Sequence, residues 1–315
     1  MKNIHLKIIF ISLVLIASFS SKVFAQYDAM FTQYMNNEMF INPAYAGSKE
    51  ALAVSILNRQ QWTGFEGRPI TNTFTIHSPV KSEKIGLGLS FSNERIGVLT
   101  HSVLYGSYSY RIKTRLKGSL SLGIMAGVHF QQQNFADVTT TVANDPSFSF
   151  NTPVITTPNF GFGALYKTDD FYIGLSIPRL LDDNIAIKDN KVEKRVSFNM
   201  RTYHYYFAIG KVFILNDEIK LKPQSMVKFV LDAPIEYDLN INALIHDKLW
   251  LGVGYRSNAD MSFMAGLQIT NNLLISYSYD TQLTKIRNYS GGSHEIICSY
   301  IFNFKGKQVV SPRYF

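Results

Sequence analysis

The chain has 315 residues, a formal net charge of +8 at pH 7 and one cysteine, Cys298. A single thiol excludes an internal disulfide framework, and the absence of a Lys/Arg-rich patch argues against nucleic-acid binding. The mean hydropathy of −0.01 fits a soluble β-protein or a transmembrane β-barrel, because only half of each barrel strand faces lipid.

The chain begins with the pattern of a secretory signal peptide. Lys2 and Lys7 supply positive charge, residues 8–19 form an apolar core, and the small-residue pattern Val-Phe-Ala ends at Ala25. The apolar core is shorter than the roughly 20 residues that a spanning helix needs. We therefore predict a signal peptide over residues 1–25, with cleavage after Ala25.

Residues 26–50 do not alternate between apolar and polar side chains. They are rich in Tyr, Phe, Met and Asn, and Asn42-Pro43 and Ala46-Gly47 are structure-breaking pairs. Because this segment precedes the first predicted strand, we expect it on the periplasmic side of a barrel. It could pack as an ordered N-terminal periplasmic arm, plug the lumen, or dock a periplasmic partner.

From residue 51 onward, runs of about ten residues alternate with a period of two. Residues 249–256 are an example, with Leu, Leu, Val and Tyr on one face and Trp, Gly, Gly and Arg on the other. Runs of this length cross a bilayer when tilted. We predict an all-β fold, a transmembrane antiparallel β-barrel of about fourteen strands over residues 51–304. The predicted strands are 51–60, 69–78, 84–93, 102–112, 118–130, 157–166, 170–177, 203–214, 219–230, 235–246, 248–257, 261–270, 272–281 and 293–304.

The predicted connections alternate in length. Every second connection is short, and the long connections all fall in the other set: 61–68, 94–101, 131–156, 178–202 and 282–292. Outer-membrane barrels have short periplasmic turns and longer external loops, so this parity predicts the cell outer membrane and contact with its lipid. Loop 131–156 suits protein contact, whereas loop 178–202, charged with both signs, is expected to be solvated.

The candidate anchors for a partner protein lie in the segment 26–50, at the end of the first predicted strand and in the C-terminal tail. Trp and Arg are favoured at binding hot spots, although Trp62 could instead belong to the aromatic belt at the outer interface. The tail, residues 305–315, ends in an aromatic residue beyond the last predicted strand. The candidate partner-binding residues are Phe40, Asn42, Pro43, Tyr45, Arg59, Gln61, Trp62, Pro312, Arg313, Tyr314 and Phe315.

No catalytic or cofactor constellation stands out. The histidines after residue 25 are never paired at metal-ligand spacing, and Ser293, His294 and Glu295 alternate between the two faces of one strand. A lipid-modifying barrel enzyme would need a Ser-His pair on the lipid face. We predict no catalytic, cofactor-binding or metal-binding residues, no cofactor and no enzymatic activity.

Several motifs, in order along the chain, together resemble the PorP/SprF family. They are Gln33-Tyr34, the run from Phe40 to Ser48 (FINPAYAGS), Arg59-Gln60-Gln61-Trp62 with Gly64 and Pro69, Gly292 to Ile296 (GSHEI), and the terminal Pro312-Arg313-Tyr314-Phe315.

The resemblance implies an outer-membrane protein of the type IX secretion system of Bacteroidetes. Family members assist the secretion or surface anchoring of cargo that carries a type B C-terminal sorting domain, including gliding-motility adhesins. They are also linked to periplasmic, peptidoglycan-associated components of that system. The alternative that the barrel pattern leaves open is a porin-like passive channel for small solutes.

Overall fold

The computed structural model describes most of the chain after the predicted signal peptide. The described residues are 30–80, 84–115, 118–138, 151–188, 191–231, 233–257 and 259–302. The predicted signal peptide and the tail with Pro312, Arg313, Tyr314 and Phe315 lie outside these ranges.

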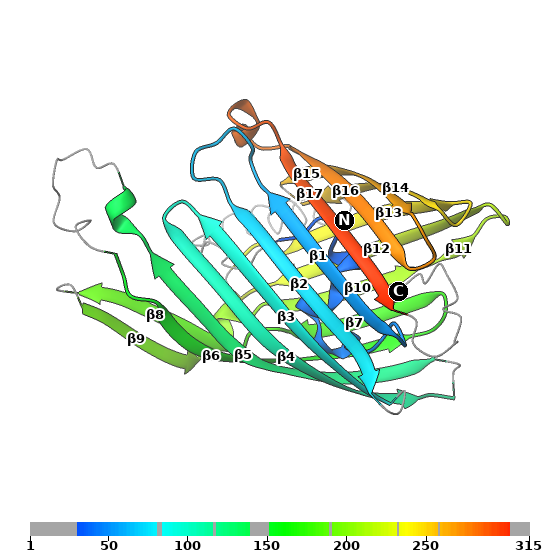
Figure 1. Ribbon diagram of the computed structural model, residues 1–315, viewed down its shortest axis with the longest axis horizontal. Helices are drawn as coiled ribbons and strands as arrows, with labels where there is room; N and C mark the ends of the chain where they lie inside the picture. The colour runs from blue at the N-terminus through cyan, green and yellow to red at the C-terminus, as the bar shows by residue number, and fades with distance from the viewer. Residues whose placement is uncertain are drawn as a thin grey trace, which may run out of the picture.

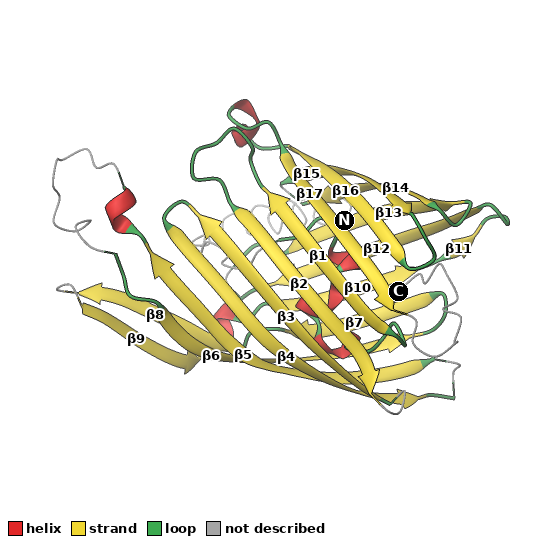
Figure 2. Ribbon diagram, in the orientation of Figure 1, coloured by secondary structure: helices red, strands yellow, loops and turns green. Residues whose placement is uncertain are grey.

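Fourteen antiparallel strands close into a barrel, which confirms the predicted fold (Figures 1 and 2). Neighbours in sequence pair throughout, the first strand pairs with the last, and β7 and β12 both pair with β10. A two-residue strand, β11 (Phe213–Ile214), adds to the edge of β12. The barrel strands are β1 (Leu52–Gln60), β2 (Ile70–Val80), β3 (Ile85–Ile96), β4 (Leu99–Lys113), β5 (Ser119–Gln133), β6 (Ile155–Lys167), β7 (Phe171–Ile177), β10 (Tyr205–Lys211), β12 (Ile219–Phe229), β13 (Glu236–Ile245), β14 (Leu249–Arg256), β15 (Asp260–Gln268), β16 (Leu273–Gln282) and β17 (Ser293–Phe302).

The two faces of the barrel wall are chemically opposite. In β5, the Leu122 and Ile124 side chains are 50% and 62% exposed, while Ser121 and Met125 on either side of them are buried. In β16 the buried face carries Ser276, Ser278, Asp280 and Gln282. Large apolar side chains outside and small or polar ones inside are the pattern of a barrel in lipid.

The connection after β7 differs from the solvated loop expected over residues 178–202. It contains a hairpin, β8 (Leu181–Lys188) and β9 (Lys191–Phe198), which forms a two-stranded sheet separate from the barrel. The link expected over residues 94–101 is also shorter, because β3 continues to Ile96 and β4 begins at Leu99. Strand residues thus replace most of the predicted loop.

The barrel encloses a compact segment, residues 30–49, which we call the N-terminal segment. It consists of three short helices, η1 (Tyr34–Asn36), α2 (Glu38–Ile41) and η2 (Pro43–Tyr45), which lie between the walls in Figure 2. Phe31, Tyr34 and Met35 pack against inward side chains such as Leu57 and Ile297. Among the described residues, no helix has the length and apolar character required to span a membrane. The core of the protein is therefore the contact between this segment and the lumen wall.

Candidate functional site

The N-terminal segment is hydrogen-bonded to strands on many sides of the lumen. The backbone N–H groups of Thr32 and Gln33 donate to the two carboxylate oxygens of Glu295 on β17, at 3.0 and 2.8 Å. On β2, the Asn37 side chain donates to Thr73 Oγ1 at 3.1 Å. Contacts of this kind satisfy polar groups that the irregular backbone of the segment would otherwise leave unpaired.

Two buried arginines form an ion-pair cluster beside the start of the segment. Arg59 Nη1 lies 2.8 Å from Asp280 Oδ2 and 3.1 Å from Glu295 Oε2, and none of these side chains is exposed. The hydroxyl of Thr32 joins them, donating to Asp280 Oδ2 at 2.7 Å. Buried charges persist only when they are paired and hydrogen-bonded, so the segment helps to complete this cluster.

The second arginine, Arg256 on β14, ties the wall directly to the segment. Its Nε and Nη2 donate to the two oxygens of Asp238 at 2.8 and 3.1 Å, a bidentate arrangement, and Nη2 also donates to the Phe31 carbonyl at 3.0 Å. Asp260 lies further off, 3.7 Å from Nη1. A planar guanidinium suits such a fork, because it has several donors in fixed directions.

The candidate residues of the FINPAYAGS motif lie inside the barrel. The Asn42 side chain caps η2 by accepting from Ala44 N at 2.9 Å, and its Nδ2 donates to the Ala164 carbonyl at 3.1 Å. Pro43 occupies the first turn of η2, where its missing N–H costs nothing. The Tyr45 ring packs edge-on against Tyr172. These residues shape the segment and seat it on β6 and β7.

Phe40 and the tyrosines of the segment complete this packing. The Phe40 ring meets Phe31 edge-on, with centroids 5.4 Å apart. Burial raises the pKa of the Tyr34 and Tyr45 hydroxyls above the usual value, so both hydroxyls stay neutral at physiological pH. The Tyr34 hydroxyl accepts from Asn240 Nδ2 at 3.3 Å. Tyr34 therefore contributes both packing and a hydrogen bond, and Tyr45 contributes packing.

The candidate residues of the RQQW motif divide between the lumen and the rim. Arg59 is fully buried in the ion-pair cluster, whereas Gln61 and Trp62 follow β1 at the end of the barrel with the longer loops. Gln61 N donates to the Pro69 carbonyl at 2.9 Å, and Trp62 has a left-handed backbone with φ of 52°. Trp62 N donates to Ser293 Oγ at 3.3 Å. The structure thus brings the RQQW and GSHEI motifs together.

The sequence reasoning missed most of the ion-pair cluster. Each missed residue lies on the small or polar face of its strand, and this position was the signal available in the sequence. The sequence did not show which residues on different strands would be paired. The missed members are Asp238, Arg256, Asp260, Asp280 and Glu295. Within the described residues, no group of three or more His, Cys, Asp or Glu side chains is placed to hold a metal ion.

Comparison with known proteins identifies the family. A family model described as type IX secretion system membrane protein PorP/SprF matches residues 23–300, nearly the whole chain. The chain belongs to the PorP/SprF family. As a PorP/SprF protein with a lipid-facing barrel, it is an outer-membrane component of the type IX secretion system. Its family implies interaction with components of that system and with cargo in general.

Solved structures similar to this PorP/SprF protein are outer-membrane barrels. The CymD monoaromatic hydrocarbon channel is 11% identical, with a TM-score of 0.50 over 88% of this chain and 95% of that chain. The Acinetobacter baumannii outer membrane protein Omp33 is 8% identical, with a TM-score of 0.45 over 81% of this chain and 100% of that chain. At these identities, likeness to CymD shows the fold alone. A search of curated proteins found no match.

Proposed function

We propose that the protein assists the secretion or surface anchoring of cargo that carries a type B C-terminal sorting domain, such as gliding adhesins. The proposal rests on the PorP/SprF match over residues 23–300. It takes periplasmic, peptidoglycan-associated type IX components as further partners, and it takes the role to be non-enzymatic. Cargo would meet the end of the barrel with the longer loops, where Gln61 and Trp62 lie beside the loop that precedes β17.

The filling of the lumen supports this proposal over the porin-like alternative. Residues such as Phe31, Met39 and Tyr45 are at most 3% exposed within the barrel. A passive channel needs a continuous water-filled path, and the N-terminal segment occupies the space where that path would run. In the proposal, the segment stabilises the barrel as a docking platform.

Deletion of the gene from the native cell tests the proposal. The proposed role predicts that one or a few proteins with type B sorting domains disappear from the cell surface, while general outer-membrane composition is unchanged. The measurement is quantitative mass spectrometry of surface-shaved peptides, with complementation by the intact gene as the control. A complementing variant with Trp62→Ala and Gln61→Ala would separate loss of cargo contact from loss of the barrel.

Two results would contradict the proposal. One is an unchanged set of surface proteins in the deletion strain. The other is a growth defect on particular small nutrients, rescued by an unrelated porin, together with a stable open-channel current for the purified protein in planar bilayers. That pair of observations would favour the solute-channel alternative.

A further inference from the structure

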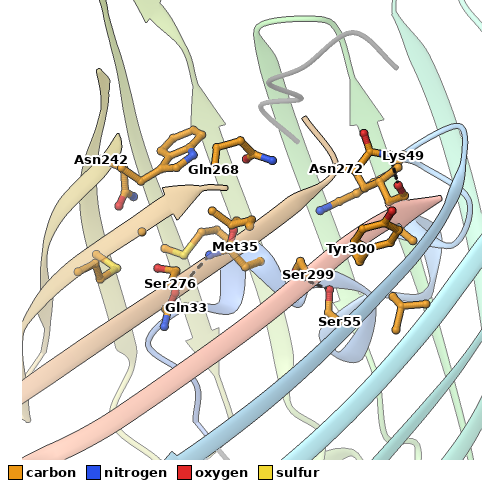
Figure 3. A pocket seen from close by; sticks show the side chains of 18 of the residues that line it. Gln33, Met35, Lys49, Ser55, Asn242, Gln268, Asn272, Ser276, Ser299 and Tyr300 are labelled. Carbon is orange, nitrogen blue, oxygen red and sulfur yellow. Dashed lines mark hydrogen bonds between the residues drawn. The ribbon is translucent and has the colours of Figure 1, made fainter. Parts of the chain in front are cut away.

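A small cavity lies between the N-terminal segment and the wall formed by β12 to β17 and β1. Its volume is about 80 Å³, and Figure 3 shows Gln33 and Met35 of the segment on one side and Ser299 and Tyr300 of β17 on the other. Lys49 and Asn272 place it at the end of the barrel that carries the short turns. Short turns mark the periplasmic end of an outer-membrane barrel.

Two buried hydrogen-bond donors of this cavity lack acceptors. The Nδ2 of Asn242 and the indole Nε1 of Trp250 are both buried, and among the described residues neither has a hydrogen-bond partner. The Asn242 side chain faces the cavity in Figure 3, and the residue is 7% exposed. An unpaired buried donor carries a free-energy cost, so two of them beside one cavity point to a ligand with acceptor atoms.

The charge of the cavity favours an anion. Lys49 and Lys222 both line it, and among the described lining residues there is no Asp or Glu. The carboxylate of Glu38, in the N-terminal segment, attracts the charge of Lys222 electrostatically, but Glu38 does not line the cavity. Met35, Met264 and Leu274 contribute apolar side chains to the lining.

We propose that this cavity binds a carboxylate whose oxygens accept from Asn242 Nδ2 and Trp250 Nε1. Lys49 and Lys222 balance its charge, and a short aliphatic group attached to the carboxylate packs against Met35 and Met264. A carboxylate fits because it is an acceptor-only group with room for several donors. This chemistry is shared by free short-chain carboxylic acids and by the C-terminal residue of a polypeptide.

Fluorescence of Trp250 provides a direct test. The chain has two tryptophans, so Trp62→Phe leaves Trp250 as the one reporter in the full-length protein in detergent. Butyrate and the tripeptide Ala-Ala-Val are titrated at constant ionic strength, each beside its neutral amide. We expect a saturable change in Trp250 emission with at least one carboxylate and none with the amides.

Variants locate the response. Asn242→Ala should weaken binding roughly tenfold, as expected for loss of one charge-assisted hydrogen bond. Lys49→Met should also weaken binding, whereas the exposed Lys248→Met, which carries the same charge change outside the cavity, should not. The heat-dependent band shift in gel electrophoresis confirms that each variant is folded, and Lys49→Met serves if Asn242→Ala does not fold.

The outcomes distinguish the two sources of the carboxylate and decide whether the proposal holds. Binding of butyrate alone identifies a free acid as the ligand, and binding of the tripeptide acid alone identifies a polypeptide end. Equal responses to acids and amides, no saturation with either acid, or equal affinities in Lys49→Met and Lys248→Met would overturn the proposal. Because the readout uses purified protein without cargo, failure here leaves the proposed secretion role intact.

Discussion

Arg59 and Glu295 are paired across the seam that closes the barrel. They are Cα partners in the register of β1 and β17, 236 positions apart in sequence, and their side chains meet at 3.1 Å with neither exposed. Glu295 also accepts the backbone N–H groups of Thr32 and Gln33. One carboxylate therefore links closure of the barrel to seating of the N-terminal segment.

The first prediction concerns this shared contact. Arg59→Met should destabilise the folded barrel by about 3–5 kcal/mol, because it leaves the buried carboxylates of Asp280 and Glu295 without their cation. The measurement is the free energy of unfolding by urea in lipid vesicles, followed by the heat-dependent band shift. Arg287→Ala, on the exposed helix η6 (Lys285–Asn288), is the control and should change stability little.

A double variant distinguishes charge from packing. Adding Glu295→Gln to Arg59→Met removes one of the two unbalanced charges, so it should recover part of the lost stability. If the double variant is as unstable as the sum of the single variants, the cost comes from packing volume, and the electrostatic account of the seam is wrong.

The second prediction concerns close approach of the segment to the wall. A Cβ atom at Gly123 on β5 would lie 2.3 Å from Ala44 N and 2.4 Å from the Pro43 carbonyl carbon, both backbone atoms. Gly123→Leu should therefore displace the segment from its seat, at a cost of about 1–3 kcal/mol for overpacking. With the lumen less filled, the single-channel conductance in planar bilayers should rise above that of the wild type.

Gly106→Leu is the matched control for this substitution. Gly106 is on the exposed face of β4, and the nearest heavy atom to its Cβ position is the Ala126 carbonyl oxygen, 3.9 Å away. The same change in side-chain size should leave conductance at the wild-type level. Equal conductance in the Gly123 and Gly106 variants would show that the segment does not control passage through the lumen.

The sequence predicted the wall of the barrel well because strand alternation is a local property. The predicted strand 248–257 corresponds to Leu249–Arg256, and its predicted faces match the exposure, because Leu251 and Val253 are exposed and Arg256 is buried. Successive side chains of a barrel strand face lipid and the lumen in turn, so the side-chain type at each position indicates which face it occupies. Each run could therefore be assigned without knowledge of its neighbours.

The interior could not be predicted in the same way. Arg59 and Glu295 are Cα partners on β1 and β17, and no local pattern reveals this pairing because it exists only once the sheet closes. The hairpin β8–β9 was also missed, because its mixed charges are typical of a solvated loop. A hairpin outside the membrane has no lipid-facing side, and its sequence therefore lacks the apolar alternation of the wall.

The third prediction concerns how this hairpin is held against the barrel. Asn159 on β6 is fully buried, and its side chain accepts from Leu180 N and Leu181 N at 3.0 and 3.1 Å and donates to the Leu181 carbonyl at 2.8 Å. Asn159→Ala should free the base of the hairpin, since several backbone groups lose partners at about 1–3 kcal/mol per buried unsatisfied group.

Trypsin cleavage reports this release. The exposed Lys194 and Arg195 on β9 are the expected sites, and cleavage there should be faster in Asn159→Ala than in the wild type. Asn184→Ala, an exposed asparagine of β8, is the control. An unchanged cleavage rate in Asn159→Ala would mean that other contacts suffice to hold the hairpin.

The fourth prediction concerns the pH range of hairpin docking. Burial raises the pKa of Asp183. His129, whose Nδ1 lies 3.2 Å from the carboxylate, and the Thr157 hydroxyl, at 2.7 Å, lower this pKa by more. The pKa of Asp183 therefore lies below its usual value. A carboxylate with a lowered pKa contributes stability above its unfolded pKa of about 3.9 and loses it as pH falls through the folded value. Hydrogen exchange of the backbone amides of β8 should therefore show protection, and so a docked hairpin, at both pH 7 and pH 5.

Substitution of the carboxylate separates this contribution from general acid effects. Asp183→Asn should raise hydrogen exchange in β8 at pH 7, where the wild type is protected, and it should remove any further change between pH 5 and pH 3. If wild-type protection is lost already between pH 7 and pH 5, a group with a higher pKa controls docking.

The fifth prediction concerns the lipid-facing band. Ile124 on β5 is 62% exposed near the middle of its strand, and Ile214 on β11 is 68% exposed at the short-turn end. An arginine on the lipid face costs about 2–4 kcal/mol at the bilayer midplane and about 0–1 kcal/mol near an interface. Ile124→Arg should therefore lower the free energy of unfolding in lipid vesicles by several times as much as Ile214→Arg.

The two positions have similar exposure, so ordinary surface substitution would give similar effects. Equal costs in vesicles, or the same difference in detergent micelles without a bilayer, would show that depth in the membrane does not explain the result.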